Sequence, residues 1–359
     1  MNGYAFKEPK TEWLFRGSSR FFRVGLHYRF TFQAEICARP PSRERLLSTA
    51  MDKPAADTVA IRSEQDFSES FFAPDAPGWT VEFGARTDVG RRRSRNEDHY
   101  AVFRFRRGAE VLLANLSSSD FRLADSYSHA LVVADGIGGM NSGDLASQLA
   151  LQTMVDLAGQ ATSWVMKLTD FDQQQIEQRV SAYVQRMHAT LREVGSRDPA
   201  TENMGTTWTS AHLLGRTAVI VHLGDSRAYL YRNARLHQVT RDDTMAQALI
   251  DSGVRPEQVL RFGHILLNCM GGTNDVAQAS IHHFELETGD RILLCSDGLT
   301  DLVSDQEIGS VLDSVRTPQA ACDQLVQRAL DQGGRDNITV VIAALEDPAE
   351  TKSEIIART

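Results

Sequence analysis

Short apolar runs bounded by Gly, Asn or Asp recur along the chain from about residue 79 onward. The runs are rich in β-branched residues or alternate apolar with polar positions, as β-strands do. They lie at residues 128–136, 205–213, 217–225, 227–240, 290–298 and 336–345. Within the run at 227–240, Asn233 and Ala234 predict the turn of a hairpin. The pattern therefore predicts a domain rich in β-sheet.

Helical periodicity separates the early strands. Leu145, Leu149 and Val155 mark one amphipathic helix. A second helix is marked by apolar residues at helical spacing: Ile176, Val180, Val184, Met187 and Leu191. A third is expected over residues 317–334, where the last two glycines end it as a C-cap. Strands in runs with inserted helix pairs favour an α+β layered fold over strict βαβ alternation.

The remaining segments carry weaker patterns. Residues 1–50 are basic and rich in aromatic residues, and the stretch that follows mixes Ser, Asp, Ala and Pro as a linker does. We expect a poorly ordered basic extension and linker over 1–78, a folded domain over 79–346 and a short tail over 347–359. Inside the domain, residues 104–128 resemble an insertion or long loop, and 240–276 predict a helical flap over the sheet edge.

Composition narrows the class of protein. The chain has 359 residues, of which 42% are hydrophobic, and a net charge of -9 with a pI near 5.6. An acidic balance of this kind argues against a nucleic-acid partner. No apolar run is long enough to span a membrane. The four cysteines are scattered without metal or disulfide spacing, so we expect reduced thiols and a cytoplasmic location.

Aspartates stand at the ends of several apolar runs. Asp135, Asp225 and Asp297 end three runs, and Asp336 immediately precedes a fourth. A single Asp-Gly is usually a turn, but four carboxylates converging at one sheet edge would repel one another unless cations lay between them. Oxygen ligands without His or Cys select Mg²⁺ or Mn²⁺ over zinc. Two such ions activate water for attack on phosphorus, which makes phosphate-ester hydrolysis the candidate chemistry.

An arginine-rich segment, "GRRRSRNED" at residues 90–98, supplies a counterpart for phosphate. Guanidinium groups suit bidentate phosphate recognition. The segment contains four of them: Arg91, Arg92, Arg93 and Arg95. Taken alone, such a segment is more often a solvated charge cluster. Together with the aspartates at the strand ends, it provides the missing phosphate-binding element, and the adjacent carboxylates of Glu97 and Asp98 follow it directly.

Six motifs in order complete a recognisable set: "RSRNED", "VVADGIGGMNSGDLAS", "MGTTWTSA", "GDSRAYLYR", "CSDGLTD" and "GGRDNITVV". Their order and spacing resemble the metal-dependent serine/threonine phosphatases of type 2C, the PPM family, in its bacterial style. The match runs over residues 79–344. The resemblance implies a four-layer αββα fold, in which a central antiparallel β-sandwich is flanked by helix pairs. It also implies a centre of two Mn²⁺ or Mg²⁺ ions at one end of the sandwich.

The resemblance assigns metal ligands at the matching positions. Asp135 would bridge both ions, and the carbonyl oxygen of Gly136 would coordinate one of them. Asp297 and Asp336 would bind the other ion. Asp225 would be a ligand of a weaker third ion.

Other roles follow from the same resemblance. Glu97 and Asp98 would hold metal-bound waters, and Arg93 matches the phosphate-binding arginine. Asn337 is expected to hydrogen-bond near the phosphate or a metal-bound water. We expect Thr206 and Thr207 to shape the strand under the site.

The implied activity is metal-dependent hydrolysis of phosphoserine and phosphothreonine in proteins, with a phosphoprotein substrate and an opposing bacterial-type serine/threonine kinase as partners. The alternative is a non-catalytic phosphoprotein-binding module on the same fold. Such a module would be expected to lack one of Asp135, Asp297 and Asp336, and all three are present. Cys295 lies in an apolar run and is interpreted as a core residue.

Overall fold

Two antiparallel sheets form the centre of the fold in the computed structural model, which describes residues 80–107, 126–138, 142–160 and 173–346. Within these residues, one sheet has five strands in the order β1 (Thr80–Asp88), β12 (Ile338–Glu346), β11 (Arg291–Cys295), β7 (Arg227–Arg232) and β8 (Arg235–Gln238). The other has the order β10 (Ser280–Glu285), β6 (Thr217–Leu223), β5 (Trp208–Leu214), β3 (Ser126–Ile137), β4 (Gly205–Thr206) and β9 (Met270–Gly271), with β2 (Asp98–Arg107) also paired to β3.

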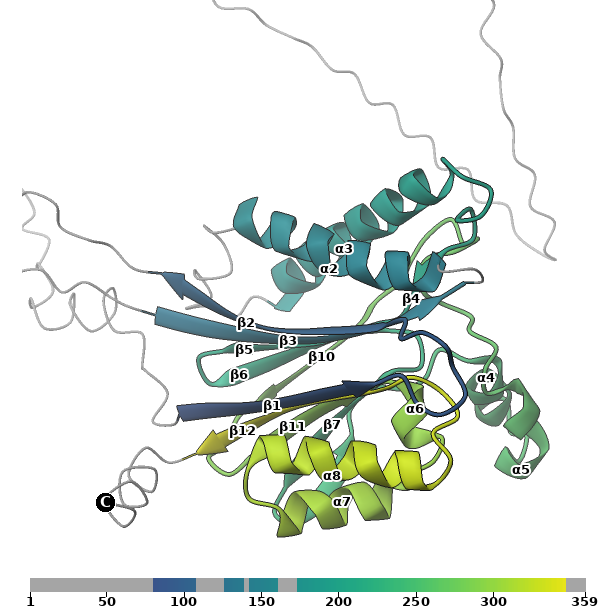
Figure 1. Cartoon of the computed structure of the whole chain (residues 1–359). Coiled ribbons are helices and arrows are strands. Elements are labelled where there is room, and N and C mark those ends of the chain that lie inside the picture. The colour runs from purple at the N-terminus through teal and green to yellow at the C-terminus, as the bar shows by residue number, and fades with distance from the viewer. Residues whose placement is uncertain (1–79, 108–125, 139–141, 161–172, 347–359) are drawn as a thin grey trace, which may run out of the picture. The chain divides into compact units, whose positions relative to one another are not determined.

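Helices cover the outer face of each sheet. Helices α2 (Ser142–Gln160) and α3 (Gln173–Gly195) lie on the sheet that contains β3, and α7 (Asp305–Ser314) and α8 (Pro318–Asp331) lie on the sheet that contains β12 (Figure 1). The expected four-layer αββα arrangement is confirmed. Helix α7 and strand β10 were not predicted, because "SIHHFE" alternates weakly and α7 is a short helix directly after a motif.

Continuous apolar runs in the central strands reflect burial on both faces. In β3, Leu131 and Val133 pack between the two sheets, whereas Val132 and Ala134 pack against the helix layer. All four side chains are fully buried. A strand that is covered on both faces has no polar side to alternate with, so period-2 patterning is lost. The same division holds in β12.

The predicted hairpin is confirmed between β7 and β8. Arg232 pairs with Arg235, and the two residues between them have φ of 53° and 57°. Consecutive left-handed residues of this kind form the tight turn that matches strand twist. Residues 104–107 and 126–128, which were expected to lie in an insertion, instead extend β2 and β3 as a paired ladder. The rest of the insertion lies outside the described residues, as do 1–79 and 347–359.

Helix α2 forms where it was predicted, but two of the residues that marked it face solvent. Leu145 and Val155 are 38% and 43% exposed, whereas Ala146, Ala150 and Met154 are buried against the sheet. The small alanines allow the helix to pack close to β3, so the buried face is set by fit rather than by side-chain size. In α3 the predicted positions Val184, Met187 and Leu191 are buried.

The flap predicted over residues 240–276 contains two short α-helices, α4 (Met245–Asp251) and α5 (Pro256–Val259), followed by the 3-10 turn η2 (Leu260–Phe262). It follows β8 and lies near the same end of the sandwich as the short helix α6 (Asp297–Thr300) (Figure 1). Among the described helices, none combines the length and the apolar character that crossing a membrane requires.

Strand direction brings the predicted site residues to one end of the sandwich. Strand β3 runs toward this end through Asp135, and β2 starts from it at Asp98. Strand β11 ends just before Asp297, and β12 begins just after Asp336. Because neighbouring strands are antiparallel, these alternating starts and ends coincide at a single edge.

Gly84 of β1 provides a test of the sheet-to-helix packing. A Cβ atom at this position would lie 2.3 Å from the backbone nitrogen of Gln319 in α8. We expect Gly84→Ala to lower the free energy of unfolding by about 1–3 kcal/mol through overpacking. Urea denaturation measures the change. The control is Gly309→Ala in α7, where a Cβ makes only ordinary contacts and removal of glycine from a helix stabilises by about 0.5–1 kcal/mol. Equal effects of the two substitutions would contradict the packing argument.

Candidate metal and phosphate site

Asp98 and Asp135 face each other across the β2–β3 ladder. Asp98 is buried, and its Oδ2 accepts hydrogen bonds from the Ser296 and Thr339 hydroxyls, both at 2.7 Å. Its other oxygen, Oδ1, is buried without a hydrogen-bond partner among the described residues. A buried carboxylate oxygen left unpaired is costly, so Asp98 Oδ1 is suited to a water or an ion.

The backbone of Asp135 is held by two threonines at the junction of β4 and β5. Its N–H donates to Thr207 Oγ1 at 3.0 Å, and its carbonyl oxygen accepts from Thr207 N–H and from the Thr206 hydroxyl, both at 2.8 Å. These bonds involve no carboxylate oxygen of Asp135. The threonines therefore fix the strand end, as expected for "MGTT", and leave the Asp135 side chain available for the site.

Gly136 occupies a position where no other residue fits. A Cβ here would lie 2.2 Å from the Gly143 carbonyl oxygen and 2.8 Å from that of Glu97. The Gly136 N–H donates to the Glu97 carbonyl at 3.1 Å, which ties the end of β3 to the segment before β2. The glycine after Asp135 thus permits close approach of three backbone segments at the site.

Electrostatics in this cluster disfavour ionised carboxylates. Burial and the neighbouring aspartates raise the pKa of Asp135 and of Asp297 well above the ordinary value. Burial also raises the pKa of Asp98 to about 6 and that of Asp225 to about 7. The charges of four neighbouring aspartates contribute to the raised pKa of Asp135: Asp98, Asp225, Asp297 and Asp336. The structure therefore brings five of the predicted residues into one electrostatic unit.

The residues fit a hard divalent cation. Asp297 Oδ1, like the unpaired oxygen of Asp98, is buried and has no partner among the described residues. All donors here are oxygen atoms, which Mg²⁺ and Mn²⁺ prefer. In the described part of the chain, no three carboxylate, imidazole or thiol groups come together closely enough to hold an ion by side chains alone. An ion here would accordingly also take backbone carbonyl oxygens, such as that of Gly136, or water.

Asp336 and Arg93, predicted as metal ligand and phosphate binder, are paired with each other. The distance from Arg93 Nη2 to Asp336 Oδ2 is 2.5 Å, and the Arg93 side chain is 53% exposed. This ion pair places the Arg93 guanidinium at the solvent side of the carboxylates. Glu97 lies nearby, where burial raises its pKa and the charge of Arg93 opposes the rise.

Asn337 hydrogen-bonds to the segment that carries Arg93, and its expected contact near the phosphate or a metal-bound water stays a prediction. Its Nδ2 donates to the carbonyls of Val89 at 3.0 Å and Arg95 at 2.8 Å, and its Oδ1 accepts from Glu97 N–H at 2.9 Å. Both amide hydrogens are therefore used within the protein. Asn337 positions the segment that carries Arg93, and we assign it that role.

The base of the flap is attached beside Asp225. Gly224 N–H donates to Asp243 Oδ2 at 3.1 Å, and Asp243 N–H donates to the Gly224 carbonyl at 2.7 Å. His222 Nε2 lies 3.1 Å from the carbonyl oxygen of Arg241. These contacts join the end of β6 to residues 241–243 and fix the loop that presents Asp225.

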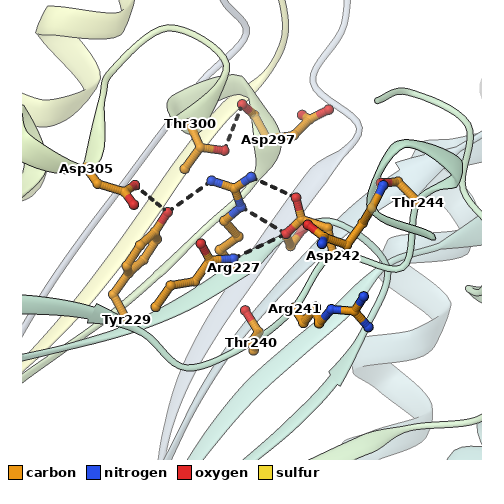
Figure 2. A network of polar contacts seen from close by, with 12 residues as sticks. Arg227, Tyr229, Thr240, Arg241, Asp242, Thr244, Asp297, Thr300 and Asp305 are labelled. Carbon is orange, nitrogen blue, oxygen red and sulfur yellow. Dashed lines mark hydrogen bonds and ion pairs between the residues drawn. The ribbon is translucent and has the colours of Figure 1, made fainter. Parts of the chain in front are cut away.

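Arg227 completes this attachment through a polar network that Figure 2 shows. Its Nε and Nη2 donate to the two carboxylate oxygens of Asp242 at 2.9 and 2.7 Å, a bidentate pair. Its Nη1 donates to the Tyr229 hydroxyl at 3.2 Å, which donates to Asp305 at 2.9 Å. Thr300, in the same view, bonds to the carbonyl oxygen of Asp297 at 3.4 Å. We call this Arg227–Asp242 pair with Tyr229 the flap clamp.

Several supporting residues were not predicted from the sequence. Ser296 and Thr339, which hold Asp98, are 198 and 241 residues away from it in the chain. No local pattern indicates such contacts. Asp242 lies within the predicted flap, and its complementarity to Arg227 becomes visible only when β7 and the flap are side by side.

Asp225 provides a test of the carboxylate repulsion in metal-free protein. Its pKa of about 7 in the folded state exceeds the ordinary value of 3.8, so ionisation of Asp225 destabilises the folded protein: this destabilisation is absent below about pH 4 and fully developed above about pH 7. We expect Asp225→Asn to become more stable than the wild type as pH rises from 4 to 8, by on the order of 2 kcal/mol. Thermal unfolding in EDTA across this range measures the difference. A pH-independent difference would contradict the assignment.

The flap clamp predicts that removing the charge of Asp242 strongly lowers the stability of the protein. Arg227 and Asp242 side chains are only 26% and 14% exposed. We expect Asp242→Asn to destabilise the protein by about 2–4 kcal/mol, because it leaves a buried guanidinium without its counter-ion. Asp323→Asn removes the exposed partner of Arg86 and should cost less than about 1 kcal/mol. Chemical denaturation compares the two, and similar losses would argue against a buried clamp.

Comparisons with known proteins agree with the resemblance to type 2C phosphatases. The family model for protein phosphatase 2C matches residues 107–332. The serine/threonine protein phosphatase PstP of Mycobacterium tuberculosis is 33% identical over 272 residues, which cover 74% of this chain and 45% of that protein. The serine/threonine phosphatase stp of Listeria monocytogenes is 30% identical over 260 residues, 72% of this chain and 93% of that protein. The chain thus spans about half the length of the mycobacterial relative and nearly all of the listerial one.

A solved structure also resembles this chain. It is the catalytic domain of the serine/threonine protein phosphatase PstP in complex with two manganese ions, with a TM-score of 0.58 and 31% identity, covering 75% of this chain and all of that one. The residues matched by the family model include Asp135, Asp225 and Asp297, whereas Arg93 and Asp336 lie just outside them. The chain belongs to the protein phosphatase 2C family.

Proposed function

We propose that this chain hydrolyses phosphoserine and phosphothreonine in proteins, using Mn²⁺ or Mg²⁺ held by the carboxylates at the end of the sandwich. One observation carries the proposal: buried aspartates with unpaired oxygens and raised pKa values converge beside an exposed arginine. The phosphatase names of the relatives and the two manganese ions in the PstP structure support it.

We assign the ligands as follows. Asp135 and the carbonyl oxygen of Gly136 would hold one ion, with Asp135 shared between both ions. Asp297 and Asp336 would hold the second, and Asp225 a weaker third. Bound ions would lower the pKa of coordinated water and so supply a nucleophile for phosphorus.

Other residues act on the substrate and on water. Arg93 would donate to the oxygens of the phosphate, and its present bond to Asp336 holds the guanidinium at the site. Asp98, whose Oδ2 is fixed by two hydroxyls, presents Oδ1 to a water and can accept a proton there. Glu97 would orient a second water. Water would protonate the leaving oxygen, since Ile137, which follows the Asp135–Gly136 pair, carries no acidic proton.

The domain bounds, the substrate, the partner kinase and the location remain predictions from the sequence. We propose a catalytic domain over 79–346, consistent with the described strands, which begin at Thr80 and end at Glu346. A phosphorylated protein is the proposed substrate and a serine/threonine kinase the proposed opposing partner. A cytoplasmic location, expected from the dispersed cysteines, likewise remains a prediction.

Hydrolysis of a phosphothreonine peptide in EDTA, Mg²⁺ or Mn²⁺ tests the function. We expect turnover only with added metal, loss of turnover in Asp135→Asn and Asp297→Ala, and a KM raised about tenfold or more in Arg93→Ala, because one phosphate donor is lost. Circular dichroism checks that each variant is folded. Full activity of Asp135→Asn would contradict the assigned centre. No hydrolysis with any metal by folded protein would favour the phosphoprotein-binding module.

A further inference from the structure

The arginine turn, defined here as residues 90–95, is fixed at both ends. The side chain of Asn337 donates to the carbonyl of Val89 just before the turn and to that of Arg95 at its end. Asn337 is itself buried at the start of β12. The turn therefore presents its side chains from a backbone that is anchored to the same segment as Asp336, rather than from a free loop.

Two arginines of the turn are engaged within the protein. Arg91 donates from Nε to the Leu330 carbonyl at 2.8 Å, and its Nη2 lies 3.7 Å from Asp331 of α8. Arg93 is paired with Asp336 in the centre. Arg91 thus fastens the turn to α8, while Arg93 belongs to the catalytic site described above.

Three further arginines, two in the turn and one directly before Asp336, have no such partners. The side chains of Arg92, Arg95 and Arg335 are exposed and make no hydrogen bond or ion pair with the described residues. Arg95 is close enough to the site for its charge to act on Glu97, and Arg335 acts similarly on Asp301. We call Arg92, Arg95 and Arg335 the arginine rim.

The arginine rim is unusual for this chain, whose net charge is -9. Unpaired guanidinium groups beside a phosphate site attract carboxylates through charge and bidentate hydrogen bonds. An extended peptide advances about 3.3 Å per residue, so side chains within three positions of a phosphate on Arg93 come within reach of these long side chains. The rim is thus complementary to acidic residues that flank the phosphorylated residue.

We infer that the arginine rim makes this enzyme select phosphorylated segments with Asp or Glu close to the phosphorylated residue. This inference rests on the proposed phosphatase activity and adds a substrate class to it. Arg93 binds the phosphate itself, and the arginine rim binds the acidic side chains on either side of it.

Paired peptides test the inference. Two phosphothreonine peptides differ only in having Glu or Gln at the three positions on either side, and kcat/KM is measured for both. Each exposed ion pair contributes a factor of about three, so two or three pairs with the rim should make the wild type favour the Glu peptide by about ten- to thirtyfold. The triple variant Arg92→Gln, Arg95→Gln, Arg335→Gln should favour it less than twofold. The preference of the wild type should also fall at high salt, which screens exposed charges.

Controls separate substrate selection from loss of catalysis. Arg235→Gln removes one guanidinium at the opposite end of the five-stranded sheet, where the β7–β8 hairpin turns, and should retain the full preference. The substrate p-nitrophenyl phosphate has no flanking residues, so in the triple variant its kcat/KM should change by the same factor as that of the Gln peptide, and the Glu peptide should lose at least fivefold more.

The outcomes distinguish failure of the inference from failure of the proposed function. Hydrolysis of p-nitrophenyl phosphate with equal kcat/KM for both peptides, or with a preference that the triple variant retains, overturns the inference alone. Absence of all hydrolysis overturns the proposed function. In that case fluorescence anisotropy of the two labelled peptides still decides the inference, and equal affinities would overturn it.

Discussion

Repulsion among buried carboxylates is the constraint on which this site depends. Asp98 and Asp135 lie opposite each other on adjacent strands, and Asp225 and Asp297 add their charges from other elements. Burial and mutual repulsion oppose ionisation of the whole group. The fold keeps it together because the strands behind are buried on both faces, between the sheets and under the helices. The position of the site is therefore set by the buried core of the protein.

Neutral hydrogen-bonding residues hold the charged ones in place. Thr207 fixes the backbone of Asp135, Ser296 and Thr339 fix one oxygen of Asp98, and Asn337 fixes the turn that carries Arg93. None of these partners adds charge to the carboxylate cluster, whose ionisation is already unfavourable. They leave carboxylate oxygens unpaired on the side of the site, which is the arrangement that a divalent cation requires.

The arginines around this acidic centre lie at different depths in the protein. Arg227 is largely buried and serves the flap clamp, where its bidentate partner Asp242 keeps residues 241–243 beside Asp225. Arg93 lies at the boundary between the carboxylates and solvent. The arginine rim is exposed. A buried guanidinium needs a fixed counter-ion, whereas an exposed one can exchange solvent for a substrate, so depth separates structural from recognition roles.

The sequence by itself determined the strand runs, the hairpin at Asn233 and the set of aspartates, because local patterning and motif order are encoded over short distances. It also placed helix α2, but named Leu145 and Val155 as its buried face, since the fit against β3 is not a local property. Only the tertiary structure decided that the Asn337 amide hydrogen-bonds to both ends of the arginine turn and that the Ser296 and Thr339 hydroxyls both donate to Asp98. Those contacts join residues 198 to 248 positions apart, and only the antiparallel closure of the two sheets brings them together.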